Sequence, residues 1–251
     1  MNEIVIGGFV SVKSIIEAKS RKIYKIIFEK SRYESVNASK YHNTEKRQYE
    51  SLMRSGCQTE FVNEKEFSDL SCGNTSGGIA AVVGERIFEP FEDILNLHDG
   101  YIAMIDGIED PFNFAYSLRS LYAAGCDAVI LPERNFFSAS DVVIKSSAGA
   151  SERIRACVCE DLVLACSQLQ KKGYEIISTA KNDKAKDLYR IKVKRPLCLV
   201  FGGEKRGIKH EIIDMSDSVL KLKYPRDCHY SLPACTAVSV ISFEIARKIG
   251  K

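Results

Sequence analysis

The sequence lacks several features that would assign a chain of this length to a protein class at once. No apolar run approaches the length of a membrane span, and the first residues contain no basic segment followed by an apolar one. We therefore expect neither a membrane protein nor a secretory signal. None of the nine cysteines forms a CxxC pair, so we predict no metal site and no disulfide scaffold. Such thiols favour a reducing, cytoplasmic location. Cys157 and Cys159, two residues apart, are expected on a helix and therefore on different faces of it.

Two further absences concern function. A GxGxxG fingerprint is missing after the first predicted strand, where Gly7-Gly8-Phe9 stands, which argues against a dinucleotide-dependent dehydrogenase. The net charge of +3 is too small to indicate a nucleic-acid partner by itself. However, lysines and arginines concentrate in residues 13–54 and again in residues 181–195. Such patches fit phosphate contacts, and they also fit an ordinary solvated surface.

Short apolar runs alternate along the chain with amphipathic segments, which predicts an α/β protein with a mostly parallel sheet. We expect strands at residues 4–6, 23–28, 60–62, 77–84, 101–106, 128–131, 174–177, 199–201 and 219–222. Helices are expected at residues 11–18, 43–55, 64–70, 114–124, 161–171 and 235–249, with short helical pieces at 140–144 and 151–156. The stretch from Pro90 to Gly100, with polar residues between, predicts a domain boundary, with a linker at 93–100 between a domain of residues 1–92 and a domain of residues 101–251.

Polar and turn-forming residues concentrate directly after three predicted strands of the second domain. They occupy residues 110–119, 202–208 and 224–234. In an open α/β sheet, ligands bind at loops beyond the carboxyl ends of the strands. Glycines at residues 202, 203 and 207 would allow a ligand to approach the backbone closely. The second of these loops, taken alone, is equally consistent with a structural turn.

In order and spacing, these three segments resemble the motifs of the SpoU/TrmH family of the SPOUT superfamily. The first motif, Asp-Pro-x-Asn-x-Gly-x-x-x-Arg, is matched by Asp110, Pro111, Asn113 and Arg119, with Ala115 at the usual glycine. The second, Gly-x-Glu-x-x-Gly, is matched by Gly202, Glu204 and Gly207. The third, Ser-Leu-Asn, is matched by Ser231 and Leu232, with Pro233 in place of the asparagine. Three ordered motifs over residues 101–251 are a far more specific signal than any one of them.

The resemblance implies a C-terminal trefoil knot, an obligate homodimer and an active site that draws on both subunits. It also implies transfer of a methyl group from S-adenosylmethionine to a ribose 2′-hydroxyl in structured RNA, for which we expect rRNA rather than tRNA. Residues 1–92, with Ser76-Gly77-Gly78-Ile79-Ala80-Ala81, more weakly resemble a small ribosomal-protein-like α/β/α domain that holds RNA.

The same resemblance implies roles for individual residues. Arg119 is expected to activate the ribose hydroxyl by positioning and electrostatics, because a guanidinium is hard to deprotonate. Glu204 is expected to orient Arg119, while Asn113 and Ser231 complete the catalytic set. The cofactor is expected to contact Ser178, Thr179, Phe201, Gly202, Gly203, Gly207, Leu222, Ser231 and Leu232.

Pro233 departs most from the family pattern, because proline offers no side-chain amide and no backbone N–H. Either a branch of the family tolerates this change or catalysis is weakened. The alternatives to an rRNA methyltransferase are therefore a tRNA methyltransferase and an RNA-binding protein that has lost activity.

Overall fold

The structure is a computed structural model that describes residues 3–70, 76–133, 140–227 and 229–251. Its contacts divide the chain into two compact units, each described here by itself. Unit 1 comprises residues 1–87 and 139–153, and unit 2 comprises residues 88–138 and 154–251. No helix among the described residues is long and apolar enough to cross a membrane.

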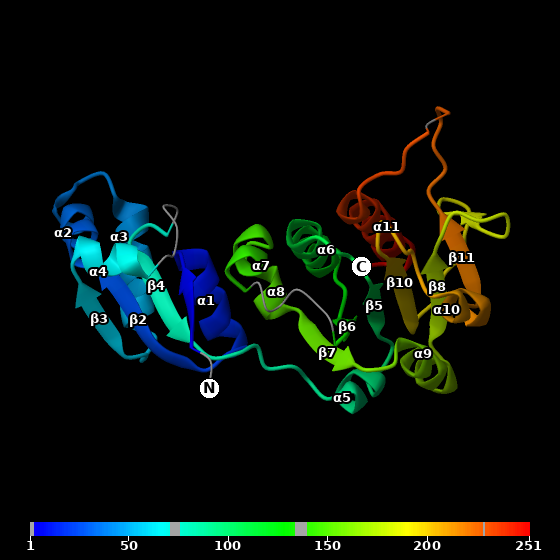
Figure 1. Cartoon of the computed structure of the whole chain (residues 1–251), viewed down its shortest axis with the longest axis horizontal. Helices are drawn as coiled ribbons and strands as arrows, with labels where there is room; N and C mark the ends of the chain where they lie inside the picture. Colours follow the sequence, from blue (N-terminus) through cyan, green and yellow to red (C-terminus); the bar gives the residue numbers. More distant parts are fainter. Residues whose placement is uncertain (1–2, 71–75, 134–139, 228) are drawn as a thin grey trace. The chain divides into compact units, whose positions relative to one another are not determined.

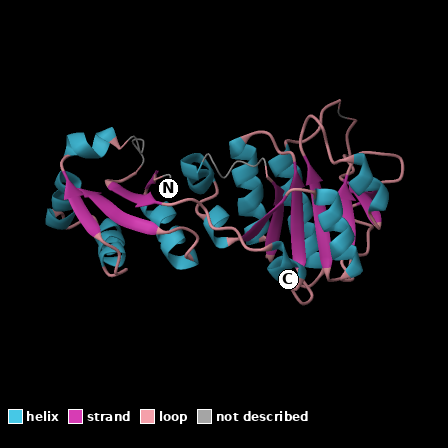
Figure 2. Cartoon of the chain, turned by 60° about the horizontal axis from the view of Figure 1, so that its bottom comes forward, coloured by secondary structure: helices cyan, strands magenta, loops and turns pink. Residues whose placement is uncertain are grey.

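Unit 1 is built on a four-stranded sheet with the order β1-β4-β2-β3, in which β2 and β3 are parallel and the other pairs antiparallel. The strands are β1 (Ile4–Gly7), β2 (Ile23–Glu29), β3 (Thr59–Val62) and β4 (Ile79–Val83). The helices are α1 (Phe9–Ala18), α2 (Lys30–Ala38), α3 (Asn43–Met53), α4 (Glu64–Asp69), α7 (Ser140–Ser146) and α8 (Ala150–Arg153). Figure 1 shows this sheet and the helices α1 to α4 in blue to cyan and α7 and α8 in green, and Figure 2 shows the same strands in magenta and the helices in cyan.

Both faces of the unit 1 sheet are buried, because neighbouring residues of a strand point to opposite sides. Ile26 and Phe28 of β2 pack into one core with residues of α1, α3 and α7. Ile27, between them, packs on the other side with Phe67 of α4. The sheet therefore separates two helical layers, as expected for an α/β/α arrangement.

The segment that carries α7 and α8 comes late in the sequence but belongs to unit 1, which differs from the predicted boundary. Sequence analysis places residues 139–153 in the second domain. In the structure, α7 and α8 pack against α1, and Ile144 is fully buried in the core of unit 1. The small side chain of Ser14 on α1 allows this close packing, because Gly149, just before α8, lies against it, while Ile144 of α7 adds apolar surface to the core.

A buried ion-pair network anchors this segment. Glu152 of α8 has a side-chain exposure of 0%, and its carboxylate lies 3.1 Å from Arg21 Nε and 3.7 Å from Arg86 Nε. Arg21 Nη2 donates a second hydrogen bond to Glu152 Oε1 at 3.2 Å, and the Ser20 hydroxyl also donates to this carboxylate. A buried carboxylate is tolerated when its partners satisfy it this completely.

Removing only the charge of this carboxylate tests the network. We expect Glu152→Gln to lower the free energy of unfolding by about 2 kcal/mol, because Arg21 is then buried without a counter-charge. Glu50→Gln is the matched control, since the Glu50–Arg54 pair is 59% and 81% exposed and such pairs contribute about 0.5 kcal/mol or less. Urea unfolding curves of the two variants decide the matter. Equal losses would show that the buried network does not stabilise unit 1.

Unit 2 contains a seven-stranded sheet with the order β7-β6-β5-β10-β8-β11-β9, in which every neighbouring pair is parallel. This confirms the predicted α/β class with a mostly parallel sheet. The strands are β5 (Tyr101–Asp106), β6 (Ala128–Pro132), β7 (Arg155–Cys159), β8 (Glu175–Thr179), β9 (Lys186–Asp187), β10 (Leu197–Gly202) and β11 (Ser218–Lys221). The helices are α5 (Phe91–Leu95), α6 (Pro111–Ala123), α9 (Leu162–Lys171), α10 (His210–Met215) and α11 (Ala234–Lys248).

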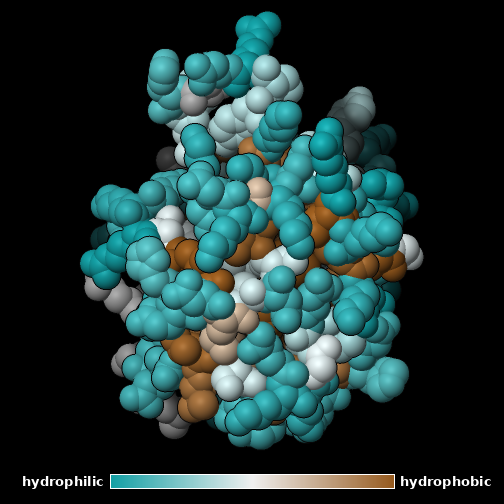
Figure 3. Space-filling model, turned by 90° about the vertical axis from the view of Figure 1, so that its right-hand side faces the viewer, coloured by the Kyte–Doolittle hydropathy of each residue, from teal (hydrophilic) through white to brown (hydrophobic). Residues whose placement is uncertain are grey.

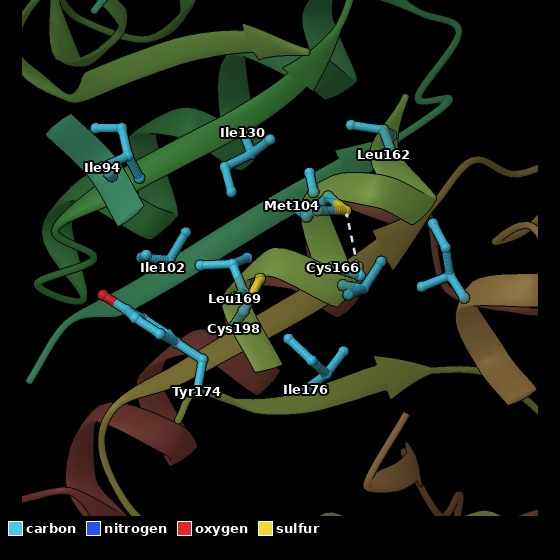
Figure 4. Packing of buried hydrophobic residues seen from close by; sticks show 14 of the residues in the cluster. Ile94, Ile102, Met104, Ile130, Leu162, Cys166, Leu169, Tyr174, Ile176 and Cys198 are labelled. Carbon is cyan, nitrogen blue, oxygen red and sulfur yellow. Dashed lines mark hydrogen bonds between the residues drawn. The ribbon is translucent and has the colours of Figure 1, made fainter. Parts of the chain in front are cut away.

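Helices cover both faces of this sheet. On one face, α5, α9 and α10 bury their apolar sides against residues such as Ile102 and Ile176 (Figure 4). On the other face, α6 and α11 pack against each other and against the sheet. Burial of alternate residues on both sides explains why β5 and β10 read as continuous apolar runs.

Two cysteines lie in a different element from the one predicted. Sequence analysis places Cys157 and Cys159 on a helix, pointing to different faces, but both belong to strand β7. Two residues apart in a strand, they share a face. All seven cysteines described by the structure are free thiols. Burial raises the pKa of Cys126 and of Cys166 to about 12, so both remain protonated apolar fillers of the core.

Candidate active site

The candidate site lies where four parallel strands of unit 2 end at the same edge of the sheet. Strands β5, β8, β10 and β11 run in parallel and end at Asp106, Thr179, Gly202 and Lys221. The loops that follow them include the three motif segments. In Figure 1 the segment between β11 and α11 (orange to red) extends beyond the ends of the strands. The parallel topology thus brings together segments that are far apart in the sequence.

These loops enclose a cavity of about 1100 Å³. Nine residues predicted for the site line it: Asn113, Thr179, Gly202, Gly203, Glu204, Gly207, Leu222, Ser231 and Leu232. They come from all three motif segments and from the end of β8. The cavity is large enough for a drug-sized ligand. The side of the molecule nearest β11 and α10 is largely hydrophilic, with smaller hydrophobic patches between (Figure 3).

The glycines of the second motif are required by close backbone packing. A Cβ at Gly203 would clash with the carbonyl oxygen of Gly107, and a Cβ at Gly202 would clash with the backbone of Gly207 and Ile208. Gly207 has a φ of +65°, which L side chains rarely adopt. Hydrogen bonds from Gly203 N to Asp106 O at 2.9 Å and from Gly207 N to Gly203 O at 3.0 Å hold the turn. The motif therefore forms a tight wall that leaves backbone groups open to the cavity.

Glu204 joins the first and third motifs, although not through the residue we predicted. Its Oε1 accepts a hydrogen bond from Asn113 Nδ2 at 2.9 Å and another from the Ala234 backbone N–H at 3.1 Å. The thiol of Cys235 donates to Asn113 Oδ1 at 3.2 Å, which completes the orientation of the Asn113 amide. Because Pro233 is the N-cap of α11 and has no side-chain acceptor, Glu204 supplies that acceptor.

This geometry predicts distinct effects for two substitutions of Glu204. Glu204→Ala removes the acceptor for Asn113 and for the start of α11, and we expect it to lower the free energy of unfolding by about 1 kcal/mol. Glu204→Gln retains an oxygen at the same position and is expected to be within about 0.5 kcal/mol of the unmodified protein. Urea unfolding of both variants measures the difference. A glutamine variant as unstable as the alanine variant would mean that the negative charge, rather than the acceptor, is what matters.

Two predicted cofactor contacts do not line the cavity. The Ser178 side chain is fully buried and shares a hydrogen bond of 2.7 Å with Ser216 Oγ. Phe201 is 2% exposed and lies within β10. Both side chains are buried in the sheet, so neither reaches the cavity as predicted. The neighbouring Thr179, which does line the cavity, donates to Val200 O at 2.9 Å.

Arg119 also lies outside the cavity. It is exposed on α6, and it has no hydrogen bond or ion pair among the residues that the structure describes. The predicted pair between Glu204 and Arg119 is therefore not formed within one chain. Phe112 and Tyr116 precede Arg119 by seven and three residues, so they share its face of the helix. They are 50% and 43% exposed, which leaves an aromatic surface around an unpaired cation.

Sequence reasoning missed a group of cations around the cavity. Lining residues include Lys181, Arg206, Lys221, Lys223 and Arg226. Lys181 belongs to the basic run at residues 181–195, but nothing in the sequence places that run beside the motif segments. For the remaining four cations the sequence does contain a signal, which is their position. They lie in or next to the segments that follow β10 and β11. Within the described part of the chain, no three His, Cys, Asp or Glu side chains are grouped to hold a metal ion.

The hydroxyl of Tyr224 joins the two arms of the third motif segment at its base. Tyr224 and Leu232 lie on opposite arms of the segment between β11 and α11, and the Leu232 N–H donates to the Tyr224 hydroxyl at 3.1 Å. Both residues line the cavity. This hydrogen bond closes the base of the projecting segment and presents Ser231 and Leu232 to the cavity.

Known proteins resemble this chain in sequence over the same residues that form the cavity. The model of the SpoU rRNA Methylase family matches residues 100–243 of this chain. A protein of Staphylococcus haemolyticus assigned to the TrmH family tRNA/rRNA methyltransferases is 29% identical over 177 residues, which cover 68% of this chain and 70% of the relative. A Staphylococcus epidermidis protein with the same assignment is 26% identical and covers 99% of this chain and 97% of its own length.

Solved structures share the whole fold. The rRNA methyltransferase of Sinorhizobium meliloti with bound AdoMet has a TM-score of 0.77 at 17% identity, covering 98% of this chain and 87% of that protein. The SpoU methyltransferase AviRb of Streptomyces viridochromogenes, also in complex with AdoMet, has a TM-score of 0.77 at 16% identity, covering 98% and 90%. The resemblance first seen in three short motifs is confirmed over more than half of the chain: this protein belongs to the SpoU rRNA methylase family.

Proposed function

We propose that this protein transfers a methyl group from S-adenosylmethionine to a ribose 2′-hydroxyl of structured RNA, most specifically rRNA. The observation that carries the proposal is the convergence of Asn113, Glu204 and Ser231, from three distant segments, on one cavity of about 1100 Å³. Membership of the SpoU family supports methyl transfer to RNA as the reaction class. Two structural neighbours, from Sinorhizobium meliloti and Streptomyces viridochromogenes, hold bound AdoMet.

The cavity suits S-adenosylmethionine. Gly202, Gly203 and Gly207 offer backbone groups without side chains in the way, and Leu222 and Leu232 supply apolar walls for an adenine ring. Bound there, the cofactor would supply an electrophilic methyl group. The role of the chain is to hold that group beside the ribose and to align the hydroxyl oxygen with it.

We assign the positioning of the hydroxyl to Arg119 of a second subunit. Arg119 lies outside the cavity of its own chain, so a homodimer that contacts through α6 and α11 is needed to bring it to a site. The exposed Phe112, Tyr116 and Phe243 on these helices supply apolar surface for such a contact. A guanidinium there would stabilise developing negative charge on the oxygen. The trefoil knot implied by the family resemblance is part of this proposal.

Charge around the cavity fits an RNA substrate. Lys181, Arg206, Lys223 and Arg226 are exposed at its lining and can contact phosphates on either side of the target ribose. We assign RNA holding to unit 1 as well, which contains the basic run of residues 13–54. A separate RNA-holding unit favours a large folded RNA over tRNA.

The test is methylation of RNA purified from cells that lack the protein. With labelled S-adenosylmethionine we expect incorporation into rRNA, and alkaline hydrolysis should leave a labelled dinucleotide, because a 2′-O-methyl group protects its phosphodiester. Label that is released in mononucleotides would indicate base methylation and would contradict the ribose assignment. Label confined to the tRNA fraction would contradict the rRNA assignment alone.

A second candidate is an RNA-binding protein without catalytic activity, favoured by Pro233 at the usual asparagine. The same assay separates the two. Binding of S-adenosylmethionine by calorimetry without methyl transfer to any RNA fraction would support the second candidate.

A further inference from the structure

A second cavity, of about 360 Å³, lies entirely within unit 1 and takes no part in the proposed methyl transfer. It is enclosed by the start of α1, by α2 and α3, by the approach to β4, and by α7. Its deep walls are apolar, since Val36 and Ile79 are each 2% exposed and Ile144 is fully buried. A concave site with an apolar floor and a few polar groups is typical of small-ligand binding.

Polar groups of this cavity come mainly from α2 and α3, while α7 adds Lys145, which is paired with Asp141 at 2.9 Å. Arg32, Glu45 and Gln48 all line it. Neither the Arg32 guanidinium nor the Gln48 amide has a hydrogen bond or ion pair among the described residues. Glu45 Oε1 lies 3.0 Å from His42 Nδ1, and the carboxylate also accepts from the Glu45 backbone N–H, yet its two oxygens have lone pairs for a further donor. The cavity therefore presents both donors and acceptors that the protein itself does not use.

The position of Arg32 is determined by a glycine. Its side-chain stem lies so close to Gly78 that a Cβ there would come within 2.9 Å of Arg32 Cγ. The neighbouring turn is held by a hydrogen bond from the Tyr49 hydroxyl to Gly77 O at 2.9 Å. The stem of Arg32 is thus packed against this turn beside the cavity, while the residue as a whole remains exposed to solvent.

We propose that this cavity binds the base of one unpaired nucleotide of the RNA, and that it prefers a base with an exocyclic amino group. The proposal deepens the proposed function and depends on it for the identity of the partner as RNA. The surface around the cavity supports a polyanion, because Lys30, Lys46 and Arg47 lie on the same two helices as Arg32 and Gln48.

The chemistry of the cavity matches a base better than a phosphate or a peptide. The faces of a base are apolar enough for Val36, Ile79 and Ile144, while its edge requires hydrogen bonds. A glutamine amide can bind adenine in a bidentate manner, and a carboxylate accepts from an amino group. Gln48 and Glu45 supply these two groups. Uracil carries no exocyclic amino group, so it should gain less binding free energy from these two side chains. Single-stranded and bulged nucleotides are the usual targets of such recognition in RNA.

The test uses the full chain and three RNA hairpins that differ at one bulged position, which carries adenosine, uridine or an abasic ribose. Fluorescence anisotropy of end-labelled hairpins gives the dissociation constants. We expect the adenosine hairpin to bind about tenfold more tightly than the abasic one, because one recognised base contributes about that much to affinity. The uridine hairpin should lie between them.

Variants assign the effect to the cavity. Gln48→Leu and Arg32→Met should each reduce the tenfold preference for adenosine to about twofold or less. Arg47→Met is the matched control on α3, outside the cavity lining, and should weaken all three hairpins equally without changing the preference. Unfolding curves must first show that each variant is folded. If a variant is unstable, ultraviolet crosslinking of a 4-thiouridine bulge to α3 replaces it.

Equal affinity of the unmodified protein for the adenosine and abasic hairpins would overturn this inference. So would a preference that survives both cavity variants. Neither result would affect methyl transfer, because the hairpins need not contain the target ribose. Conversely, suppose that the protein transfers no methyl group and still prefers the adenosine hairpin. That result would contradict the proposed function and leave this inference intact.

Discussion

Arg119→Ala will lower methyl transfer by about a thousandfold and leave S-adenosylmethionine binding unchanged. A loss of rate of this size is expected when one charged group that stabilises the developing negative charge on the ribose oxygen is removed. Binding should persist because the role assigned to Arg119 is to position the ribose hydroxyl of the RNA, whereas the cofactor is assigned to the glycines and leucines of the cavity. Single-turnover rates with labelled cofactor, and calorimetry for its binding, measure the two effects separately. Arg119→Lys keeps the charge but loses the planar fork, so we expect intermediate activity.

The same residue allows a direct test of a shared site. Mixing Arg119→Ala with Leu232→Arg, which places a charge in the cavity, should restore activity that neither variant has alone. Half of the dimers then contain one of each chain, and one of their two sites is intact, so about a quarter of full activity is expected. Mixtures that stay inactive, or a protein that sediments as a monomer, would contradict the assignment of Arg119 to the partner's site.

Gly203→Ala is expected to abolish detectable S-adenosylmethionine binding, with a loss of at least about a hundredfold in affinity. The new Cβ would occupy the position of the Gly107 carbonyl oxygen, which is backbone and cannot move as a side chain can. The turn that lines the cavity must therefore shift, and we also expect about 3 kcal/mol of lost stability. Calorimetric titration with the cofactor and urea unfolding measure the two effects.

Gly207→Asn is the matched control in the same turn. Nothing lies within 4 Å of a Cβ built at Gly207, so the change is opposed only by its φ of +65°. Asparagine tolerates that conformation better than most residues, and we expect a loss of about 1 kcal/mol or less with binding retained. A Gly203→Ala variant that binds as well as Gly207→Asn would show that the close approach to Gly107 is not needed.

The motif residues of the site were predictable because three short patterns occur in one order. Asn113, Glu204 and Ser231 all reach one cavity, as expected for loops at one edge of a parallel sheet. The partners of these residues were not predictable. Glu204 contacts the backbone N–H of Ala234, a group that no side-chain pattern reveals, and Arg119 has no partner among the residues that the structure describes.

The fold was predicted best where the spacing of the apolar residues and the flanking turn or capping residues indicate the same element. The strands at residues 4–6 and 101–106 and the long C-terminal helix match β1, β5 and α11 closely. Strand β7 was missed because a short apolar run such as Ala156-Cys157-Val158 fits a helix or a strand equally well. Helix α6 begins earlier than predicted because Asp110 caps it, accepting from Asn113 N at 2.7 Å, and Pro111 opens its first turn.

The return of residues 139–153 to unit 1 has a consequence for dissecting the protein. A gene fragment that ends at residue 87 encodes Arg21 and Ser20 without Glu152, so its product would bury a guanidinium with no counter-charge and leave α1 uncovered. A fragment that begins at residue 88 would carry α7 and α8 without the core that Ile144 fills. The chain thus crosses between the units three times, and neither half is a self-contained module for expression, exchange or fusion.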